Sequence, residues 1–185
     1  MIVALPFPAT FSDLMSFDGK AELIGGRIVE QMASGRLPGR LAGRIWRSLS
    51  EHADTIGIGE AFGDNLGYAV DPPLTSGRQS FSPDTSYHAG PFPANLMAFI
   101  EVAPTFAVEV RSENDYGRSA ETAMADKRAD YFEAGTRAVW DVDPIAKTIA
   151  LYTTTSETIF RPGDLAHAGP ALPGWTLDVA ALFAS

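Results

Sequence analysis

The sequence predicts a mixed α/β or α+β fold in which one β-sheet is flanked by two main helices. Two long segments have helical periodicity, Leu37 to about Ala53 and about Arg118 to Ala134, and short β-prone segments precede and follow each of them. This order of helix, strands, helix and strands is typical of a sheet covered by helices. Because no internal repeat or low-complexity run divides the 185 residues, we expect a single domain over residues 1–185.

The first third of the chain predicts a short helix, a hairpin and the first long helix. Thr10 or Ser12 can cap a short helix within Pro8 to Asp18. A Gly-Gly turn joins two β-prone runs, Ala21 to Ile24 and Arg27 to Gln31, which predicts a hairpin. In the first long helix, apolar residues recur every four positions, at Leu37, Leu41, Ile45 and Leu49.

Short strands are expected through most of the remaining chain. Gly135 ends the second long helix, and the tail from Trp175 to Phe183 has the pattern of a last short helix. The expected β segments are Ile58 to Val70 with a turn at Gly63-Asp64-Asn65, Gln79 to Tyr87, Phe99 to Val102, Thr105 to Arg111, Ala138 to Val142, Thr148 to Tyr152 and Thr158 to Phe160.

Composition narrows the class of protein. Hydrophobic residues make up 45% and charged residues 20%, which is ordinary for a globular chain. No apolar run approaches the roughly 18 residues of a membrane span, so we expect a cytoplasmic protein without a membrane partner. The absence of cysteine excludes disulfides and thiolate chemistry. A net charge of −9 argues against a generic nucleic-acid coat protein, yet a metal-dependent nuclease needs an acidic site and only a local basic strip.

Two acidic residues stand in segments that otherwise predict buried strands. Glu109 lies in the middle of the run Thr105 to Arg111, and Asp84 follows Pro83 in the preceding strong β segment. A carboxylate inside a sheet is costly unless it is paired or binds a metal. Acids on neighbouring strands can share Mg²⁺ or Mn²⁺, since Mg²⁺ is often bound through one or two carboxylates. The alternative is that Asp84 caps a turn and Glu109 forms an ion pair.

Lys127 is one of only three lysines, and it lies on the apolar side of the second long helix. A buried lysine needs carboxylate partners, and this helix directly follows the strand of Glu109. Beside metal-bound carboxylates, a lysine can orient or deprotonate the water that attacks a phosphodiester. The alternative is a lysine whose stem packs on the core while its amine reaches solvent.

Four arginines follow the apolar stripe of the first long helix at steps of four, four and three residues. This spacing keeps them on one helical side and predicts a strip that contacts nucleic-acid phosphates. A solvated face is the alternative. The arginines of this strip are Arg36, Arg40, Arg44 and Arg47.

Together these residues resemble the PD-(D/E)XK nuclease signature and, over residues 20 to about 180, the Uma-type family of restriction endonucleases. The matching segments are Pro83-Asp84, Glu22 to Val29, Val108 to Ser112, Lys127 to Tyr131 followed by Ala134-Gly135, and Val139 to Pro144. The resemblance implies a restriction-endonuclease-like core and a divalent cation held by Asp84 and Glu109. It also implies a further acid near the metal, Glu22, and a catalytic lysine moved to Lys127 because Arg111 occupies the usual strand position.

The sequence therefore predicts a metal-dependent endonuclease that forms a homodimer and acts on nucleic acid, with DNA as the expected substrate. An arginine keeps its proton at any working pH, so Arg111 can position a phosphate or a carboxylate but cannot act as a base. Two other classes stay open. One is a catalytically silent nucleic-acid-binding or dimerisation module of the same fold, and the other is an acidic metal-binding protein without turnover.

Overall fold

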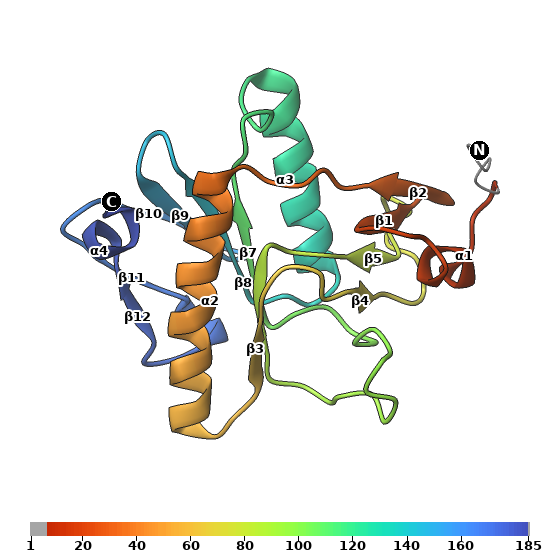
Figure 1. Cartoon of the computed structure of the whole chain (residues 1–185), viewed down its shortest axis with the longest axis horizontal. Helices are drawn as coiled ribbons and strands as arrows, with labels where there is room; N and C mark the ends of the chain where they lie inside the picture. Colours follow the sequence, from red (N-terminus) through yellow and green to blue (C-terminus); the bar gives the residue numbers. More distant parts are fainter. Residues whose placement is uncertain (1–6, 185) are drawn as a thin grey trace.

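The computed structural model describes residues 7–184, which build a six-stranded mixed sheet with helices on both faces (Figure 1). The strand order is β10-β9-β8-β7-β6-β3, so the segments from the middle of the chain form the centre of the sheet. This arrangement confirms the predicted fold class. The strands are β3 Glu60–Phe62, β6 Thr85–His88, β7 Phe106–Val110, β8 Ala138–Asp143, β9 Thr148–Tyr152 and β10 Glu157–Phe160.

Strand β7 joins the antiparallel and parallel parts of the sheet. It pairs antiparallel with β6 and parallel with β8, in a register that places Glu109 opposite Asp141. A parallel pair needs a crossover, and helix α3 (Arg118–Glu133) supplies it between β7 and β8. The crossover places α3 over the strands that carry Glu109 and Asp141.

Helix α2 (Arg36–Ile56) covers the opposite face of the sheet (Figure 1). Its buried residues pack against inward-facing side chains of β7 and β8, and the C-terminal segment completes this core. That segment consists of β11 Leu165–His167, a 3-10 turn η1 Gly169–Ala171, β12 Thr176–Asp178 and α4 Val179–Phe183. The residues of α2 in this core are Leu41, Ile45, Leu49 and Ala53.

A smaller core lies under α3. Ala107 of β7 and Val139 of β8 contact Tyr131 of α3, which stacks on Phe81 with ring centroids 4.2 Å apart. Phe81 belongs to a two-stranded sheet formed by β4 (Tyr68–Ala69) and β5 (Ser80–Phe81). The α3 face therefore has fewer apolar contacts and leaves room for polar groups.

The N-terminal hairpin attaches to this small sheet. Its strands β1 (Ala21–Ile24) and β2 (Arg27–Glu30) pair as the Gly-Gly turn predicts, and α1 (Phe11–Met15) packs beside them. The backbone N–H of Leu23 donates to Ser80 Oγ at 2.8 Å, and Leu23 O accepts from Gln79 N–H at 2.8 Å. These bonds bring Glu22, next to Leu23, towards α3.

Three predicted elements differ from the structure. The expected strand Gln79 to Tyr87 is broken into β5 and β6, which belong to different sheets, because Pro83 between them has no N–H to continue a ladder. The segment Phe99 to Val102 forms only a single bridge, at Ile100. The expected tail helix begins later, since its first residues form β12. Of the helices within residues 7–184, none has the length and hydrophobicity to cross a membrane.

Candidate active site

The break between β5 and β6 sets the position of Asp84. Pro83 ends the first pairing, and the Asp84 side chain turns towards the end of β7, where its Oδ2 accepts the backbone N–H of Val110 at 2.8 Å. This bond ties the aspartate to the strand that carries Glu109. Asp84 and Glu109 therefore lie close together, and the charge of Asp84 contributes to raising the pKa of Glu109.

Glu109 points from β7 towards α3. Its Oε1 accepts the hydroxyl of Tyr131 at 2.7 Å and lies 2.9 Å from Lys127 Nζ. Burial raises the pKa of Glu109, and the charges of Asp84 and Glu22 raise it further, against the opposing effect of Lys127. The side chain of Glu109 is 26% exposed, so it is only partly shielded from solvent.

Lys127 lies between two carboxylates. Its Nζ is 2.9 Å from Glu109 Oε1 and 3.2 Å from Glu22 Oε1. Burial alone would lower the pKa of Lys127, but the charges of Glu109 and Glu22 outweigh burial and hold the pKa above its ordinary value. Lys127 is thus an ammonium ion, with carboxylate partners as the sequence argument required.

Glu22 anchors this ammonium from the hairpin. Its Oε1 also accepts the backbone N–H of Ser82 at 3.0 Å, and its Oε2 accepts Arg78 Nη1 at 2.5 Å. The Nε of Arg78 in turn donates to Asp130 of α3 at 2.8 Å. Burial works against ionisation of Glu22, yet the charges of Lys127 and Arg78 and these hydrogen bonds lower its pKa overall. Both of its oxygens are engaged in holding cations.

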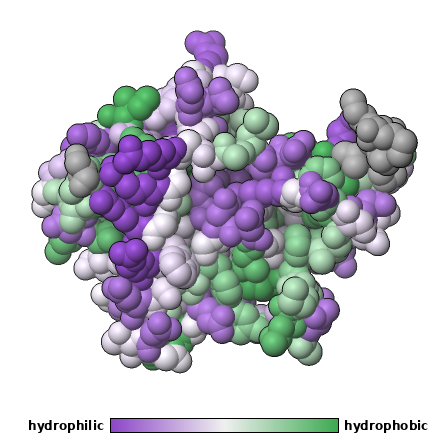
Figure 2. Space-filling model, in the orientation of Figure 1, coloured by the Kyte–Doolittle hydropathy of each residue, from purple (hydrophilic) through white to green (hydrophobic). Residues whose placement is uncertain are grey.

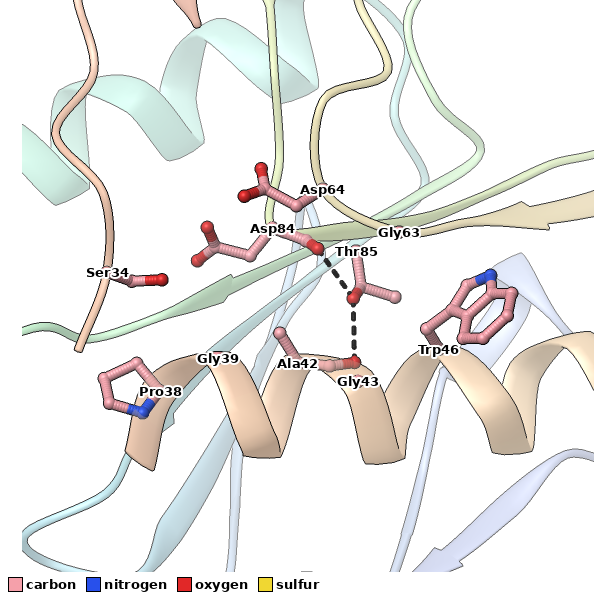
Figure 3. Close-up of a pocket in the computed structure, with 10 residues that line it drawn as sticks. All are labelled: Ser34, Pro38, Gly39, Ala42, Gly43, Trp46, Gly63, Asp64, Asp84 and Thr85. Atoms are coloured by element: carbon pink, nitrogen blue, oxygen red, sulfur yellow. Dashed lines mark hydrogen bonds between the residues drawn. The ribbon is translucent and has the colours of Figure 1, made fainter. Parts of the chain in front are cut away.

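A second lysine lies beside Asp84. Lys20, which precedes β1, forms an ion pair with Asp64 and lies 3.6 Å from Asp84 Oδ1. Figure 3 shows the carboxylates of Asp64 and Asp84 beside each other at the edge of a cavity. Neither Lys20 nor Asp64 stands out in the sequence, and these two residues give Asp84 a charged neighbourhood of its own.

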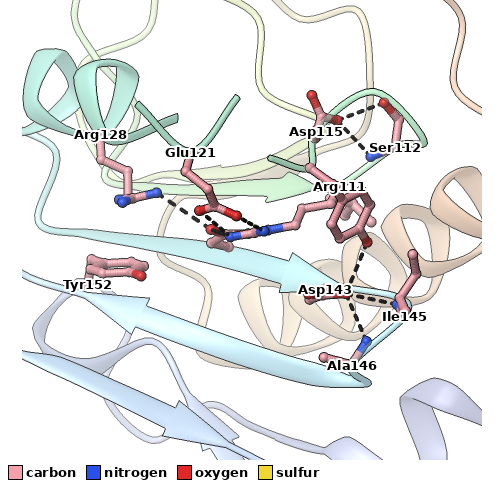
Figure 4. Close-up of polar contacts among 12 residues, drawn as sticks. Arg111, Ser112, Asp115, Glu121, Arg128, Asp143, Ile145, Ala146 and Tyr152 are labelled. Atoms are coloured by element: carbon pink, nitrogen blue, oxygen red, sulfur yellow. Dashed lines mark hydrogen bonds and ion pairs between the residues drawn. The ribbon is translucent and has the colours of Figure 1, made fainter. Parts of the chain in front are cut away.

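Arg111 lies on the α3 side of the sheet, as its spacing from Glu109 predicts, but it contacts other acids. Its Nε and Nη2 donate to Asp141 at 2.7 and 2.8 Å, and its Nη1 donates to Glu121 at 2.6 Å (Figure 4). Its hydrogen bonds to Asp141 are the largest influence on its pKa, which is raised despite burial. Arg111 therefore joins β8 to the first turns of α3, and its described hydrogen bonds do not reach Glu109.

The arginine strip lies along α2, where Figure 2 shows hydrophilic side chains gathered on this face. Arg36 and Arg47 are exposed, and Arg40 is half-buried. Arg44 is engaged within the protein, because its Nη1 donates to the carbonyl oxygens of Leu182 and Ala184 at 2.8 and 2.5 Å. Within the strip, Arg36 and Arg47 are therefore the most accessible to a ligand, whereas Arg44 is already bonded within the protein.

A cavity of about 240 Å³ separates α2 from the acids at Asp84. Figure 3 shows Pro38, Gly39, Ala42, Gly43 and Trp46 along the helical wall. The hydroxyl of Thr85 lies 3.1 Å from the carbonyl oxygen of Ala42 and links this wall to β6. The remaining lining residues are Ser34, Gly63, Asp64 and Asp84.

The donor set fits a divalent cation in part. Asp84 Oδ1 and Glu109 Oε2 accept no hydrogen bond from the part of the chain that the structure describes, although Asp84 Oδ1 forms an ion pair with Lys20 at 3.6 Å, which a ligand would have to displace or share. Two carboxylates can suffice for Mg²⁺, which keeps several waters. Within residues 7–184, His, Asp and Glu side chains nowhere form a group of three or more with metal-site spacing. Glu22, with both oxygens engaged, would be a ligand only after its ion pairs rearrange.

The profile of a known family matches residues 8–180, which includes each of the acids and both lysines of the site. The chain belongs to the Uma2 family. This family is described as "Putative restriction endonuclease", so the resemblance inferred from short motifs is confirmed. Membership in this family supports a hydrolase of the nuclease type, with nucleic acid as its substrate.

A solved structure shows that the fold is shared. It is described as "a putative nuclease belonging to DUF820" from Anabaena variabilis, and it matches this Uma2 protein with a TM-score of 0.77 and 19% identity. The match covers 95% of this chain and 98% of the other. At that identity the likeness concerns the fold. No curated protein matches the chain.

Asp84, Glu109 and Lys127, selected from the sequence, lie together in the structure, and so does Glu22, which the resemblance implied. The cations and acids that were not predicted are Lys20, Asp64, Arg78 and Asp130. Arg78 lies in a loop whose sequence carries no periodic signal, so its burial between Glu22 and Asp130 could not be expected. A usable signal existed for Asp130. It lies three residues after Lys127, and this spacing places two residues on the same side of a helix.

Proposed function

We propose that this Uma2 protein is a metal-dependent endonuclease that hydrolyses phosphodiester bonds, with DNA as its substrate. The observation that carries the proposal is the convergence of Asp84, Glu109 and Lys127. They come from the β5–β6 break, β7 and α3, and the lysine ammonium lies 2.9 Å from the glutamate. Family membership and the nuclease-like fold support the same reaction class.

Asp84 and Glu109 are the residues that would hold Mg²⁺ or Mn²⁺. When bound, such a cation activates a water nucleophile and offsets the charge on the phosphate. The two acids fit this role because Glu109 Oε2 accepts no hydrogen bond from the described residues, and Asp84 Oδ1 has only an ion pair with Lys20 at 3.6 Å. Burial is the main cause of the raised pKa of Glu109, and the charges of Asp84 and Glu22, which a cation would offset, raise it further.

Lys127 orients the attacking water and offsets transition-state charge as a protonated group. Its raised pKa argues against the role of general base in the resting protein, because Glu109 and Glu22 stabilise the ammonium form. We assign Glu22 a positioning role, since it holds Lys127 and Arg78 together. Arg111 positions carboxylates, those of Asp141 and Glu121, and thereby fixes α3 on the sheet.

The decisive experiment is a cleavage assay with purified protein, plasmid DNA and single-stranded DNA. We expect cleavage in Mg²⁺ or Mn²⁺, none in chelator, and none from Asp84→Ala or Glu109→Gln at equal protein concentration. Asp115→Asn is the matched control, because Asp115 is also a loop aspartate that accepts a backbone N–H, that of Ser112, away from the acids of the site. Cleavage by Asp84→Ala at the parent rate would place the chemistry elsewhere.

Metal binding can be measured without turnover. Calorimetric titration with Mn²⁺ should give binding to the parent and a loss of binding in the Asp84→Asn, Glu109→Gln double variant. Equal affinity of the two proteins would overturn the assignment of ligands. The same titration of Glu22→Gln tests whether the hairpin acid contributes a ligand or only positions Lys127.

A nucleic-acid-binding module without turnover is the second candidate. The observation in its favour is that Glu22, the third acid of the site, already has both oxygens engaged by cations and a backbone N–H. Tight DNA binding without cleavage in either metal would favour this module. The nuclease proposal includes a homodimer, and sedimentation of the purified protein measures the oligomeric state.

A further inference from the structure

The cavity between α2 and Asp84 is bounded by groups of three kinds. Within the helical wall, three small residues form a flat surface, the glycine floor, made of Gly39, Ala42 and Gly43. Trp46 closes one end of the cavity, and Asp64 and Asp84 lie along its edge (Figure 3). At about 240 Å³ the cavity is far larger than the roughly 10–15 Å³ that a single water molecule requires. Pro38 to Trp46 spans nine helical residues, or about 12 Å at the α-helical rise.

The glycines of the floor are not required by packing inside the protein. A Cβ at Gly43 would meet no atom within 4 Å, and one at Gly39 would meet only Ser34 Oγ, at 3.9 Å. Neither glycine has the positive φ that favours glycine over other residues. Glycine is a poorer helix former than alanine, so two glycines one turn apart weaken α2 while keeping the cavity open.

Trp46 is an aromatic surface with a fixed orientation. It is 41% exposed, whereas Trp140 and Trp175 are 0% and 2% exposed. Its Nε1–H donates to the carbonyl oxygen of Ala61 at 3.2 Å, and the ring lies against Gly63, where an added Cβ would be 3.9 Å from it. A tryptophan held this way offers a flat face without the entropy cost of ordering it.

Positive charge borders the floor. At about 100° per residue, Arg36, Arg40 and Arg47 lie on the sector of α2 next to Gly43, and on the side away from the buried stripe. Arg36 and Arg47 are exposed. A strand whose phosphates follow these arginines would place its bases over the glycine floor.

We propose that this cavity is a subsite for an unpaired base of single-stranded DNA, which stacks on Trp46 while its phosphate approaches Asp84. The inference rests on the proposed nuclease function and names its substrate class. Stacking on a protein aromatic needs a base whose face is free, and in a duplex both faces are covered by neighbouring bases. The small volume also favours one base over the width of a duplex.

Binding can be tested in chelator, so that no cleavage intervenes. The probe is a fluorescein-labelled oligothymidylate of twelve nucleotides, and the readouts are its anisotropy and the tryptophan emission of the protein. We expect the oligonucleotide to quench the emission of the exposed Trp46, and the same length of duplex to bind at least tenfold more weakly.

Three variants and one control assign the site. Gly43→Leu fills the floor and Trp46→Leu removes the ring, so each should lower single-strand affinity about tenfold or more, as the loss of one stacked base implies. Trp46→Phe should retain affinity within a few-fold but lose the quenching. Thr55→Leu, at an exposed position near the end of α2, should bind like the parent. Circular dichroism and Mn²⁺ calorimetry should be unchanged in all four.

The outcomes separate this inference from the proposed function. The proposed subsite is wrong if Gly43→Leu and Trp46→Leu bind the single strand as tightly as the parent, or if the parent binds duplex and single strand equally well. In that case, metal-dependent cleavage by the parent would still support a nuclease. If the parent neither binds nor cleaves any DNA in the presence of Mg²⁺ or Mn²⁺, both proposals fail.

Discussion

Helices α2 and α3 cover opposite faces of one sheet by different physical means (Figure 1). Helix α2 buries Leu41, Ile45, Leu49 and Ala53, all at most 3% exposed. The buried residues of α3 are Asp130 and Tyr131, and Lys127 lies beside them at 18% side-chain exposure. One interface is apolar, while the other combines a smaller apolar core around Tyr131 with buried ion pairs and hydrogen bonds.

The difference separates a face that stabilises the fold from a face suited to chemistry. Apolar burial is favourable without further conditions, whereas buried charges repay their desolvation only when each of them is paired. Lys127, Glu22, Arg78 and Asp130 satisfy this condition as an alternating series of cations and anions. Groups with shifted pKa values in such an arrangement are what a catalytic site requires.

The largest expected effect separates the two faces by activity. Lys127→Met should lower the cleavage rate by about 10² to 10³, the usual effect of removing one group that stabilises transition-state charge, while methionine retains the packing of the stem. Lys147→Met is the control, because Lys147 lies in the β8–β9 turn away from the acids. Single-turnover assays in Mn²⁺ measure both. If Lys127→Met cleaves at the parent rate and Arg111→Lys cleaves faster than the parent, the catalytic lysine position is that of Arg111 and not that of Lys127.

The next effect concerns stability. Arg78→Met leaves Glu22 and Asp130 buried without their shared cation, so the free energy of unfolding should fall by about 3–5 kcal/mol. Ile45→Val, the counterpart on the α2 face, should cost only about 0.5–1.5 kcal/mol. Urea denaturation at pH 7 measures both variants. A loss below 1 kcal/mol for Arg78→Met would mean that the α3 face does not depend on paired charge.

The two faces also differ in how far the sequence predicted them. The α2 face follows from a four-residue apolar repeat, and the observed helix extends the predicted one only at its ends. On the α3 side, local spacing identified Glu109 and Lys127 as conspicuous residues. Lys127 pairs with Glu22 of the hairpin, and Glu22 pairs in turn with Arg78 of a loop, so each pair joins residues more than thirty positions apart in the chain. Such long-range ion pairs leave no periodic pattern in one sequence.

The pH dependence of stability sharpens the contrast within the α3 face. Glu22 has a lowered pKa, so its contribution is complete above its ordinary value of 4.5 and is lost as the pH falls through its folded pKa. Glu109 has a raised pKa, so the folded protein binds its proton more readily, and its charge weakens the fold near neutrality.

Glu22→Gln should therefore lower stability at pH 7 and reduce the loss of stability in acid, whereas Glu109→Gln should raise stability at pH 7 while abolishing cleavage. Denaturant titrations from pH 4 to pH 8 measure both curves, and Ile45→Val should run parallel to the parent throughout. If both glutamine variants were destabilised at pH 7 and parallel in pH, the two glutamates would be equivalent structural ion pairs.

The smallest expected effect is on the stability of α2, which a glycine at position 43 should lower. Gly43→Ala should raise the free energy of unfolding by about 0.5–1 kcal/mol, because alanine restricts the unfolded chain and its Cβ meets no atom within 4 Å. The matched control is Gly57→Ala at the end of the same helix, where φ of +64° disfavours alanine and the change should destabilise instead. Thermal denaturation, followed by single-strand binding, measures both variants. If only Gly43→Ala gains stability and also loses affinity for the single strand, the glycine floor is a functional feature of α2. If Gly43→Ala is instead less stable than the parent, Gly43 serves the fold.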